Sequence, residues 1–485
     1  MLRKIRILLG GLFFVAVTLL FLDFTGVLHL YLGWLAKIQL LPAVLALNVG
    51  VVLFFAVVTL LVGRTYCSVI CPMGVMQDIF IWLGGKCKKN RFHYMKGLPV
   101  LRGVMLVVFV LLMVLGLNGI AILIAPYSAY GRIATNLFQP VYMWINNLCA
   151  YFAERAGSYA FYSVDVWVKS GVTLVVAAVT FVVIGFVSFR WGRLWCNTVC
   201  PVGTVLGCIS KFAIFRPVID TNKCNGCGKC AKNCKAMCIN PETHTIDMSR
   251  CVACMDCIEN CHQKAIQYRK GKAVVKTDDV DGSRRKFVAA TAAVGAAMAV
   301  QAQEKKVDGG LAVLVDKQLP ERQVPLKPFG AKSLKNFSSR CTACQLCVSE
   351  CPQKVLRPSQ KLTTMMQPEM AFDKGFCPAD CTKCSQVCPT GAIKPITPEE
   401  KSSISVGHAV TVAKNCLLAQ GVDCNACSRH CPAAAISIVN DPATGHGAVA
   451  VNEQRCIGCG ACEYYCPVRP FSAIYVEGRE VHVNV

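Results

Sequence analysis

The sequence predicts an α-helical membrane domain followed by small α+β domains built on cysteine-rich loops, and three observations support this fold class. The chain of 485 residues is 54% hydrophobic, which makes it more apolar than an ordinary soluble domain. Four apolar stretches are each long enough to cross a bilayer. The 32 cysteines gather in tight groups, a pattern typical of metal-cluster ligation. The predicted domains cover residues 1–215, 216–272, 273–340 and 341–485.

The expected membrane spans are recognised by their length, because a bilayer requires about 20 consecutive apolar residues. They cover residues 7–23, 40–62, 103–125 and 168–189. Lysine and arginine are frequent at the amino terminus and after the second and fourth stretches, and rare after the first and third. The positive-inside rule therefore predicts that the amino terminus and the 216–272 domain are cytoplasmic, an orientation that suits a protein of the bacterial inner membrane.

A short cysteine motif follows the second and the fourth apolar stretch. Residues 67–74 read CSVICPMG and residues 196–203 read CNTVCPVG, and a Gly-Arg pair precedes each motif. The repetition predicts an internal two-fold repeat. Two cysteines four residues apart lie on one face of a helix. We expect these cysteines to meet at the cytoplasmic membrane surface, as a further metal centre, as redox-active thiols, or as buried structural residues: Cys67, Cys71, Cys196 and Cys200.

Two runs in the 216–272 domain have the spacing C-x2-C-x2-C-x3-C. In two-cluster ferredoxins with this spacing, the fourth cysteine of each run ligates the other [4Fe–4S] cluster. Paired zinc sites are the alternative, and Cys238 is a spare thiol that could replace Cys234. The predicted ligands are Cys224, Cys227, Cys230 and Cys261 for the first cluster, and Cys251, Cys254, Cys257 and Cys234 for the second.

The 341–485 domain contains four more cysteine groups, each of which ends in Cys-Pro, and they predict four further [4Fe–4S] clusters. We expect the first group to exchange its fourth ligand with the last, and the second with the third. The stretches TGAIKPI, AAAISIV and FSAIYVE are expected to be short strands. The predicted ligands are Cys341, Cys344, Cys347 and Cys351; Cys377, Cys381, Cys384 and Cys388; Cys416, Cys424, Cys427 and Cys431; and Cys456, Cys459, Cys462 and Cys466.

Residues 283–302 read SRRKFVAATAAVGAAMAVQA, in which two arginines precede an Ala-rich run. This segment is similar to a twin-arginine export signal, a route that carries folded cargo. Such a route suits a domain whose clusters are inserted before export, and it predicts a periplasmic 341–485 domain. The alternative is a basic patch before an interfacial helix or linker.

The remaining polar features give further predictions. The net charge of +23 is accounted for by cytoplasmic anchoring and by anionic clusters, so we expect no nucleic-acid partner. Ionisable residues near the spans, namely Asp23, His29 and Arg102, are candidate quinol contacts. The isolated cysteines Cys87, Cys149 and Cys208 are expected to be inert.

These motifs carry a resemblance to two families. Residues 1–270 resemble the NapH family of membrane ferredoxins, and residues 283–485 resemble the NapG/MauM family of exported four-cluster ferredoxins. The resemblance implies a fusion that acts as a quinol dehydrogenase, with six [4Fe–4S] clusters, membrane lipid and the quinone pool as partners, and a periplasmic reductase or cytochrome as electron acceptor. A maturation or reactivation factor for a metalloenzyme, or a relay toward quinone, is the alternative. The prolines that usually follow the fourth cysteine are missing after Cys234 and Cys261.

Overall fold

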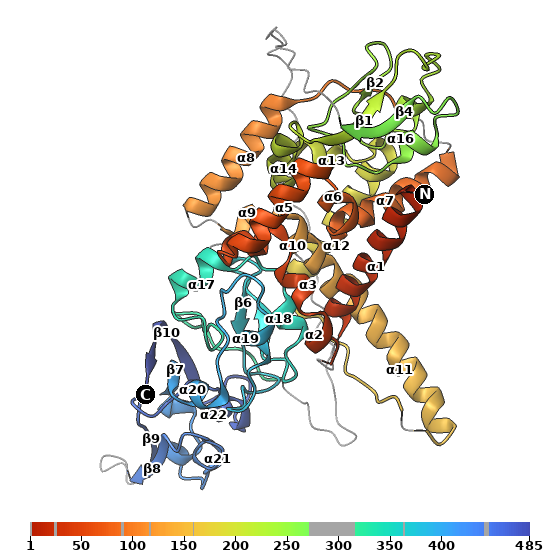
Figure 1. Ribbon diagram of the computed structural model, residues 1–485. Helices are drawn as coiled ribbons and strands as arrows, with labels where there is room; N and C mark the ends of the chain where they lie inside the picture. Colours follow the sequence, from red (N-terminus) through yellow and green to blue (C-terminus); the bar gives the residue numbers. More distant parts are fainter. Residues whose placement is uncertain are drawn as a thin grey trace, which may run out of the picture.

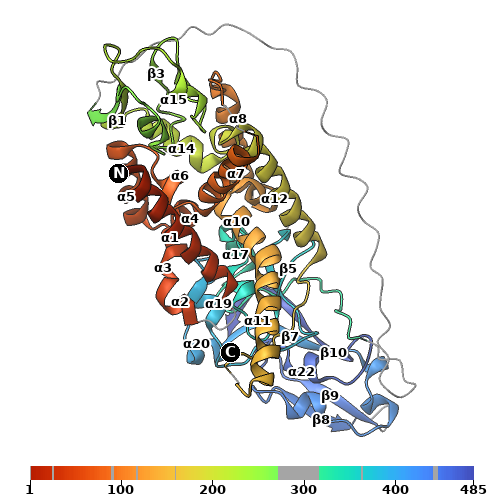
Figure 2. The ribbon, with the colours of Figure 1, turned by 90° about the vertical axis from the view of Figure 1, so that its right-hand side faces the viewer.

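A helical domain separates two ferredoxin-like regions in the computed structural model (Figure 1). The structure describes residues 2–23, 27–88, 92–115, 118–158, 160–270, 316–361, 364–440 and 446–485. In two perpendicular side views, the first ferredoxin domain lies at one end of the helices and the C-terminal domain lies at the other (Figures 1 and 2). The twin-arginine-like segment and most of the expected linker lie outside the described residues.

Two helices in the described part of the chain are long and apolar enough to cross a membrane, α1 and α12. The other helices of this domain are shorter or less apolar. The helices are α1 (Leu2–Leu22), α2 (Val27–Leu32), α3 (Trp34–Lys37), α4 (Leu40–Leu45), α5 (Val49–Val62), α6 (Tyr66–Val69), α7 (Pro72–Lys88), α8 (Pro99–Val114), α9 (Asn118–Ile124), α10 (Pro126–Ile133), the π-helical turn η1 (Ala134–Phe138), α11 (Gln139–Arg155), α12 (Gly171–Trp191), α13 (Leu194–Thr198) and α14 (Pro201–Ser210).

The structure therefore corrects the prediction of four uninterrupted spans. The second expected span is divided into α4 and α5, because Leu47 has a positive φ of 57° and Asn48 starts a new helix. The Asn48 side chain accepts a hydrogen bond of 3.3 Å from the Val51 amide, which is the usual role of an N-cap. The third expected span is divided between α8 and α9. Hydropathy alone does not detect a turn made of apolar residues.

The two cysteine motifs are folded in the same way. In each, a long helix ends at a glycine with positive φ, Gly63 at 69° and Gly192 at 59°, and a one-turn helix follows. A proline then begins the next helix, Pro72 in α7 and Pro201 in α14, where proline fits because the first turn lacks intrahelical amide partners. The halves pack crosswise, with α7 against α12 and α14 against α5.

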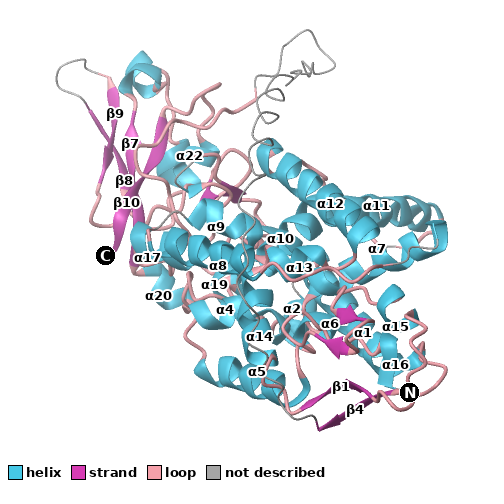
Figure 3. Ribbon diagram, turned by 90° about the horizontal axis from the view of Figure 1, so that it is seen from above, coloured by secondary structure: helices cyan, strands magenta, loops and turns pink. Residues whose placement is uncertain are grey.

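The ferredoxin-like regions contain short antiparallel strand pairs and one-turn helices (Figure 3). The pairs are β1 (Phe215–Ile219) with β4 (Ile266–Lys270), β2 (Ile239–Asn240) with β3 (Thr245–Ile246), β5 (Leu356–Pro358) with β6 (Pro368–Met370), β7 (Ile404–Thr411) with β10 (Ile474–Asn484), and β8 (Ile436–Asn440) with β9 (Gly447–Val451). The AAAISIV and FSAIYVE stretches contain β8 and the start of β10. The TGAIKPI stretch is not a strand, and its Pro395 has no amide hydrogen for a ladder bond.

Each described cysteine group places its third cysteine in a one-turn helix. These helices are α15 (Lys229–Lys232), α16 (Asp256–Glu259), α18 (Leu346–Ser349), α19 (Lys383–Val387), α21 (Ala426–Arg429) and α22 (Ala461–Tyr465). Groups with regular spacing enter the helix from a left-handed residue, as at Gln345, where φ is 64°. The two groups with a long first gap enter from Thr382 and Asn425, whose φ values are −118° and −124°. The longer gap therefore changes how the loop reaches its helix.

Candidate iron–sulfur sites

Cysteines from two loops converge twice in the first ferredoxin domain. Site 1 is a cavity lined by Cys224, Cys227, Cys230 and Cys261. Site 2 is a cavity lined by Cys234, Cys238, Cys251, Cys254 and Cys257. Each site takes a cysteine from the opposite run, which is the arrangement that the spacing predicts. Site 2 also receives the spare thiol of Cys238.

The C-terminal domain contains four further sites. Site 4 is a cavity lined by Cys351, Cys377, Cys381 and Cys384. Site 5 is a cavity lined by Cys431, Cys456, Cys459 and Cys462. Site 3 is formed by Cys341, Cys344, Cys347 and Cys388, whose thiols interact electrostatically. Site 6 brings together Cys416, Cys424 and Cys427, and Cys466 is the cysteine that remains for its fourth position.

The ligand exchange predicted for this domain is therefore wrong. The first group exchanges its fourth cysteine with the second group, and the third exchanges with the fourth. Their helices pack accordingly, α18 against α19 and α21 against α22. Sequence spacing could not decide this point, because every group has the same Cys-Pro ending and the choice depends on which loops pack together.

The cavities of sites 1, 2, 4 and 5 fit cubane clusters. Among the residues that the structure describes, no three His, Cys, Asp or Glu side chains lie close enough to hold one metal ion. A zinc ion would draw its ligands to about 2.0–2.3 Å from a single point. Thiols spread around a cavity instead match a cluster with one cysteine at each iron corner.

Four cysteines from the two repeated motifs form a further group, which we call the paired-cysteine site: Cys67, Cys71, Cys196 and Cys200. All four are buried. The halves are held together by reciprocal hydrogen bonds. Arg193 Nη1 donates to the Cys67 carbonyl oxygen at 2.7 Å, and Arg64 Nη2 donates to the Cys196 carbonyl oxygen at 3.4 Å. Each motif is therefore capped by the arginine that precedes the other motif.

Two glycines allow this close approach. A Cβ atom on Gly74 would collide with the Cys67 carbonyl oxygen, and one on Gly203 would collide with the Cys196 carbonyl oxygen. The glycine that ends each motif is therefore required by packing against its own cysteine and against the opposite arginine.

The thiols of the paired-cysteine site influence one another. Burial, reinforced by the neighbouring Cys67 and Cys196, raises the pKa of the Cys71 thiol to about 12. Burial also raises the pKa of the Cys200 thiol, and Cys196 and Cys71 add to this effect. These thiols are thus neutral at pH 7 unless a metal displaces their protons. The Cys196 thiol donates a hydrogen bond of 3.2 Å to Gln77 Oε1.

Site 2 lies directly on the paired-cysteine site. Arg64 Nη1 donates to the Ser249 carbonyl oxygen at 3.0 Å, two residues before Cys251, and its Nη2 reaches Cys67 Sγ at 3.8 Å. On the other side of the motif, the Arg193 amide donates to the Lys235 carbonyl oxygen at 2.8 Å. Both cysteine loops of site 2 are therefore anchored by the arginines of the paired-cysteine site.

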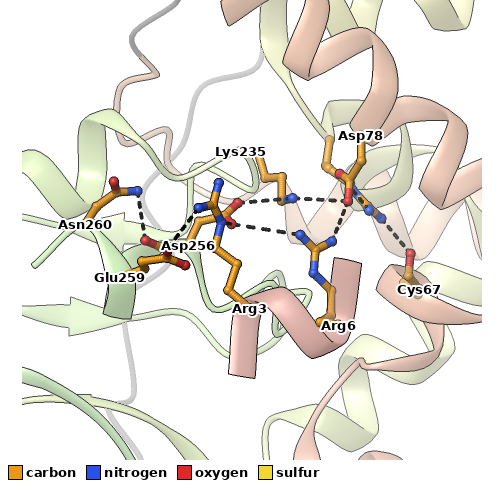
Figure 4. A network of polar contacts seen from close by, with 9 residues as sticks. Arg3, Arg6, Cys67, Asp78, Lys235, Asp256, Glu259 and Asn260 are labelled. Carbon is orange, nitrogen blue, oxygen red and sulfur yellow. Dashed lines mark hydrogen bonds and ion pairs between the residues drawn. The ribbon is translucent and has the colours of Figure 1, made fainter. Parts of the chain in front are cut away.

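A buried ionic network reinforces this contact, with Asp78 at its centre (Figure 4). Asp78 pairs with Arg193 at 2.8 Å, Arg6 at 2.7 Å and Lys235 at 3.1 Å. Lys235 also pairs with Asp256 at 3.1 Å. Burial alone would raise the pKa of the Asp78 carboxyl, but the three facing cations hold it well below its usual range. Helices α1, α7 and α13 are thereby joined to the loops of site 2.

Buried tyrosines connect the paired-cysteine site to site 3. Tyr66 lies in the same buried cluster as Cys67, Cys71 and Cys200, and its hydroxyl donates a hydrogen bond of 3.0 Å to Gln39 Oε1. Tyr127 belongs to the same cluster, together with Cys344 of site 3.

The site 3 loop itself rests on the helical domain. Asn136 Nδ2 donates to Gln345 Oε1 at 2.8 Å, and a Cβ atom on Gly131 would collide with the Cys344 carbonyl oxygen.

The sites of the C-terminal domain follow one another. Cys347 of site 3 interacts with Cys384 of site 4, and the Cys377 amide of site 4 donates a hydrogen bond of 3.0 Å to the Cys459 carbonyl oxygen of site 5. The buried ammonium of Lys401 donates to Cys377 Sγ at 3.2 Å. A cation at this position favours extra negative charge on a cluster in site 4.

The three candidate quinol contacts have other partners in the structure. Arg102 donates to the Ser249 hydroxyl at 3.1 Å and to its carbonyl oxygen at 3.2 Å. Asp23 accepts a hydrogen bond from the Leu28 amide at 2.8 Å. His29 lies on α2 and packs against Gly33. The isolated cysteines Cys87, Cys149 and Cys208 are exposed and lie outside the six sites.

Several residues at these sites were not singled out by their sequence pattern, namely Asp78, Tyr66, Tyr127 and Lys401. Their roles depend on contacts between distant segments. Arg64 and Arg193 carried a visible signal, since Gly-Arg precedes both motifs, but the crosswise contacts could not be read from it.

Comparison with protein families gives two matches, each in two places. A model described as a 4Fe-4S binding domain matches residues 44–90 and 172–219, the segments that contain the paired-cysteine site. A model described as a 4Fe-4S dicluster domain matches residues 340–392 and 422–469. These boundaries agree with ligand exchange inside each pair of groups. No solved structure matches this chain.

Several curated proteins are similar to part of the chain. The methylamine utilization ferredoxin-type protein MauM of Methylobacillus flagellatus is 33% identical over 36% of this chain and 77% of that protein. The ferredoxin-type protein NapG of Escherichia coli is 31% identical over 36% of this chain and 74% of that protein. The putative electron transport protein YccM of Escherichia coli is 28% identical over 40% of this chain, and the match spans about half of YccM, 47%.

Proposed function

Because the chain belongs to the family of MauM- and NapG-type ferredoxin-type proteins, whose members carry [4Fe–4S] clusters for electron transfer, we propose that it is a membrane-bound quinol dehydrogenase module. In this proposal six clusters occupy sites 1 to 6. Electrons enter from quinol in the helical domain and leave from the C-terminal domain toward a periplasmic reductase or cytochrome.

One observation carries the proposal, namely the order of the cysteine sites along the molecule. Site 1 adjoins site 2, because Cys257 interacts with Cys230. Site 2 rests on the paired-cysteine site through Arg64. Tyr66 and Tyr127 then lead to site 3, and sites 4, 5 and 6 follow. This order runs from one end of the helical domain to the other, as an electron carrier across a bilayer requires.

The membrane placement is part of the proposal. We infer that α1 and α12 span the bilayer and that the divided helices pack between them as a pseudo-two-fold pair. The first ferredoxin domain then faces the cytoplasm, since Arg3 and Lys4 begin α1 at that end. The C-terminal domain then faces the periplasm. Twin-arginine export of that domain remains a prediction from the sequence.

The chain's own residues position the redox groups and set their electrostatic surroundings. The clusters themselves supply one-electron chemistry when bound. Cysteine thiolates hold each cluster in a fixed cavity, and backbone amides donate to ligand sulfurs, as Ala435 does to Cys431 at 3.3 Å. Lys401 places a positive charge beside site 4. Such contacts raise a cluster's reduction potential, which quinol as a donor requires.

The proposal is tested by anaerobic reduction with a quinol. The lipid-reconstituted protein is mixed with a menaquinol analogue, and the clusters are followed by EPR and by bleaching of the thiolate-to-iron absorption. We expect a subset of clusters to be reduced within seconds. Reduction by dithionite alone would contradict a quinol dehydrogenase and would favour a relay toward quinone or a maturation factor.

A further inference from the structure

Site 2 has one thiol more than a cubane cluster needs. A [4Fe–4S] cluster takes one thiolate at each of four irons, and Cys251, Cys254 and Cys257 supply three from a single loop. Both Cys234 and Cys238 line the same cavity. They are 6% and 2% exposed.

The two remaining sulfurs are too close to serve separate corners. Cys234 Sγ and Cys238 Sγ lie 3.6 Å apart, within hydrogen-bonding distance for sulfur. Two sulfurs bound tetrahedrally to one metal at about 2.3 Å would stand roughly 3.8 Å apart. Ligands to different irons of a cubane point away from one another and stand farther apart. Cys238 also forms a side-chain hydrogen bond with Cys251. Because Cys251 belongs to the regular three-cysteine loop, the position that Cys238 can share is the one held by Cys234 on its own loop.

The local chain conformation produces this arrangement. The Met237 amide donates to the Cys234 carbonyl oxygen at 2.9 Å, and Met237 has a positive φ of 50°. This tight turn brings Cys238 back beside Cys234. The following strand β2 fixes the direction of the chain, and the Asp247 amide donates to the Cys238 carbonyl oxygen at 2.9 Å. The backbone hydrogen bonds therefore place the second thiol at the cavity.

We propose that Cys234 and Cys238 are interchangeable ligands to the fourth iron of site 2, and that the unligated thiol donates an S–H hydrogen bond to the ligated sulfur. In an exchange, one Fe–S bond breaks and one forms. The proton passes from the incoming thiol to the departing thiolate, so the step needs no oxidant or reductant. The hydrogen bond also raises the reduction potential of the cluster, because donors to ligand sulfur stabilise the reduced state.

The inference rests on a cluster in site 2 but not on quinol as the donor. It is tested with Cys234→Ala, Cys238→Ala and the double variant, purified anaerobically and compared by iron content and by EPR-monitored redox titration. Each single variant is expected to keep the wild-type iron content, and the double variant to lose one cluster. Each single variant is also expected to shift the site 2 potential to more negative values, because the S–H donor is gone.

Two control variants distinguish a failure of the ligand exchange from a failure of the cluster assignment. Cys208→Ala removes an exposed thiol in α14 and should change neither iron nor potential. Cys254→Ala removes a fixed ligand that, unlike Cys251, forms no hydrogen bond with Cys238, and should lose the site 2 cluster. Loss of that cluster in either single variant would show that one of the two cysteines is an obligatory ligand, and would overturn the exchange. Retention of the cluster in Cys254→Ala would overturn the cluster assignment itself, and with it this inference.

Discussion

At the scale of single residues, buried charges are the features that most directly shape this molecule. Lys401 is 1% exposed and donates to Cys377 Sγ and to the Pro378 and Cys381 carbonyl oxygens. Asp78 is surrounded by three cations. Each of these groups has a specific partner at or beside a cysteine site, so each substitution has a predictable local effect.

Replacing Lys401 is expected to lower the reduction potential of the site 4 cluster. A hydrogen bond to a charged group contributes about 1.5–3 kcal/mol, which corresponds to roughly 60–130 mV for a one-electron couple at 59 mV per tenfold change. Lys401→Met should shift one EPR signal by this amount in a redox titration. Lys335→Met, at an exposed position of α17 (Leu334–Arg340), is the control and should shift none. An unchanged site 4 potential in Lys401→Met would refute the assigned role.

Replacing Asp78 is expected to destabilise the contact between the helical domain and site 2. Removing one partner from a buried ion pair costs about 3–5 kcal/mol, so Asp78→Asn should lower the unfolding temperature measured by cysteine-reactive dye. Asp165→Asn removes a carboxylate whose side chain is 94% exposed and should cost about 1 kcal/mol or less.

The Asp78 contribution also depends on pH. Its folded pKa lies below the unfolded value of about 3.9, so its stabilisation is complete above that pH and is lost as the pH falls through the folded pKa. The difference in stability between wild type and Asp78→Asn should therefore be constant from pH 6 to 8. A difference that disappears within that window would contradict the network.

At the scale of elements, the junction of α6 with α7 depends on a glycine. Gly74→Ala would push a methyl group into the Cys67 carbonyl oxygen, and overpacking of this kind costs about 1–3 kcal/mol. Gly85→Ala is the matched control, since it lies in the same helix with nothing within 4 Å of the added Cβ. The unfolding temperature should fall in Gly74→Ala and stay unchanged in Gly85→Ala. Equal unfolding temperatures in the two variants would contradict the close packing of the motif.

The iron content of cysteine variants tests which loops of the C-terminal domain share ligands. Cys344 and Cys388 belong to site 3, whereas Cys384 belongs to site 4. The double variant Cys344→Ala/Cys388→Ala should therefore lose no more iron than either single variant. The double variant Cys384→Ala/Cys388→Ala should lose twice as much. Loss of twice as much iron in both double variants would instead support the exchange of the second group with the third.

At the same scale, the structure shows which features the sequence could predict and which it could not. Cysteine spacing predicted the three-cysteine loops because local spacing fixes the local geometry. It did not predict the ligand exchange of sites 3 to 6, which depends on the packing of α18 with α19 and of α21 with α22. Hydropathy placed the apolar stretches but not the break at Leu47 and Asn48, because one polar residue among many apolar ones changes the mean hydropathy of the stretch little.

At the scale of the whole molecule, one cluster of buried side chains links the three regions. It includes Val17 of α1, Cys67 of the paired-cysteine site, Cys254 of site 2 and Cys347 of site 3. The sequence predicted the meeting of the two motifs. It could not predict that the arginines would place site 2 directly against that meeting point, because Arg64 contacts Ser249 across 185 residues of chain and Arg193 contacts Cys67 across 126.

The central claim is that electrons pass between the two ferredoxin regions, in either direction, through a redox-active centre that the paired-cysteine site would hold. The direct measurement uses proteoliposomes in which all molecules have the same orientation. Dithionite, which does not cross the bilayer, is added on the side of the C-terminal domain, and rapid-freeze EPR follows the clusters of the opposite domain. Their signals are identified by their absence in a Cys224→Ala/Cys251→Ala variant.

In the wild-type protein, we expect dithionite to reduce sites 3 to 6 first, and electrons to reach sites 1 and 2 across the membrane afterwards. The variant Cys71→Ser/Cys200→Ser should reduce sites 3 to 6 normally and leave sites 1 and 2 oxidised. Reduction of sites 1 and 2 at the wild-type rate in that variant would contradict the account.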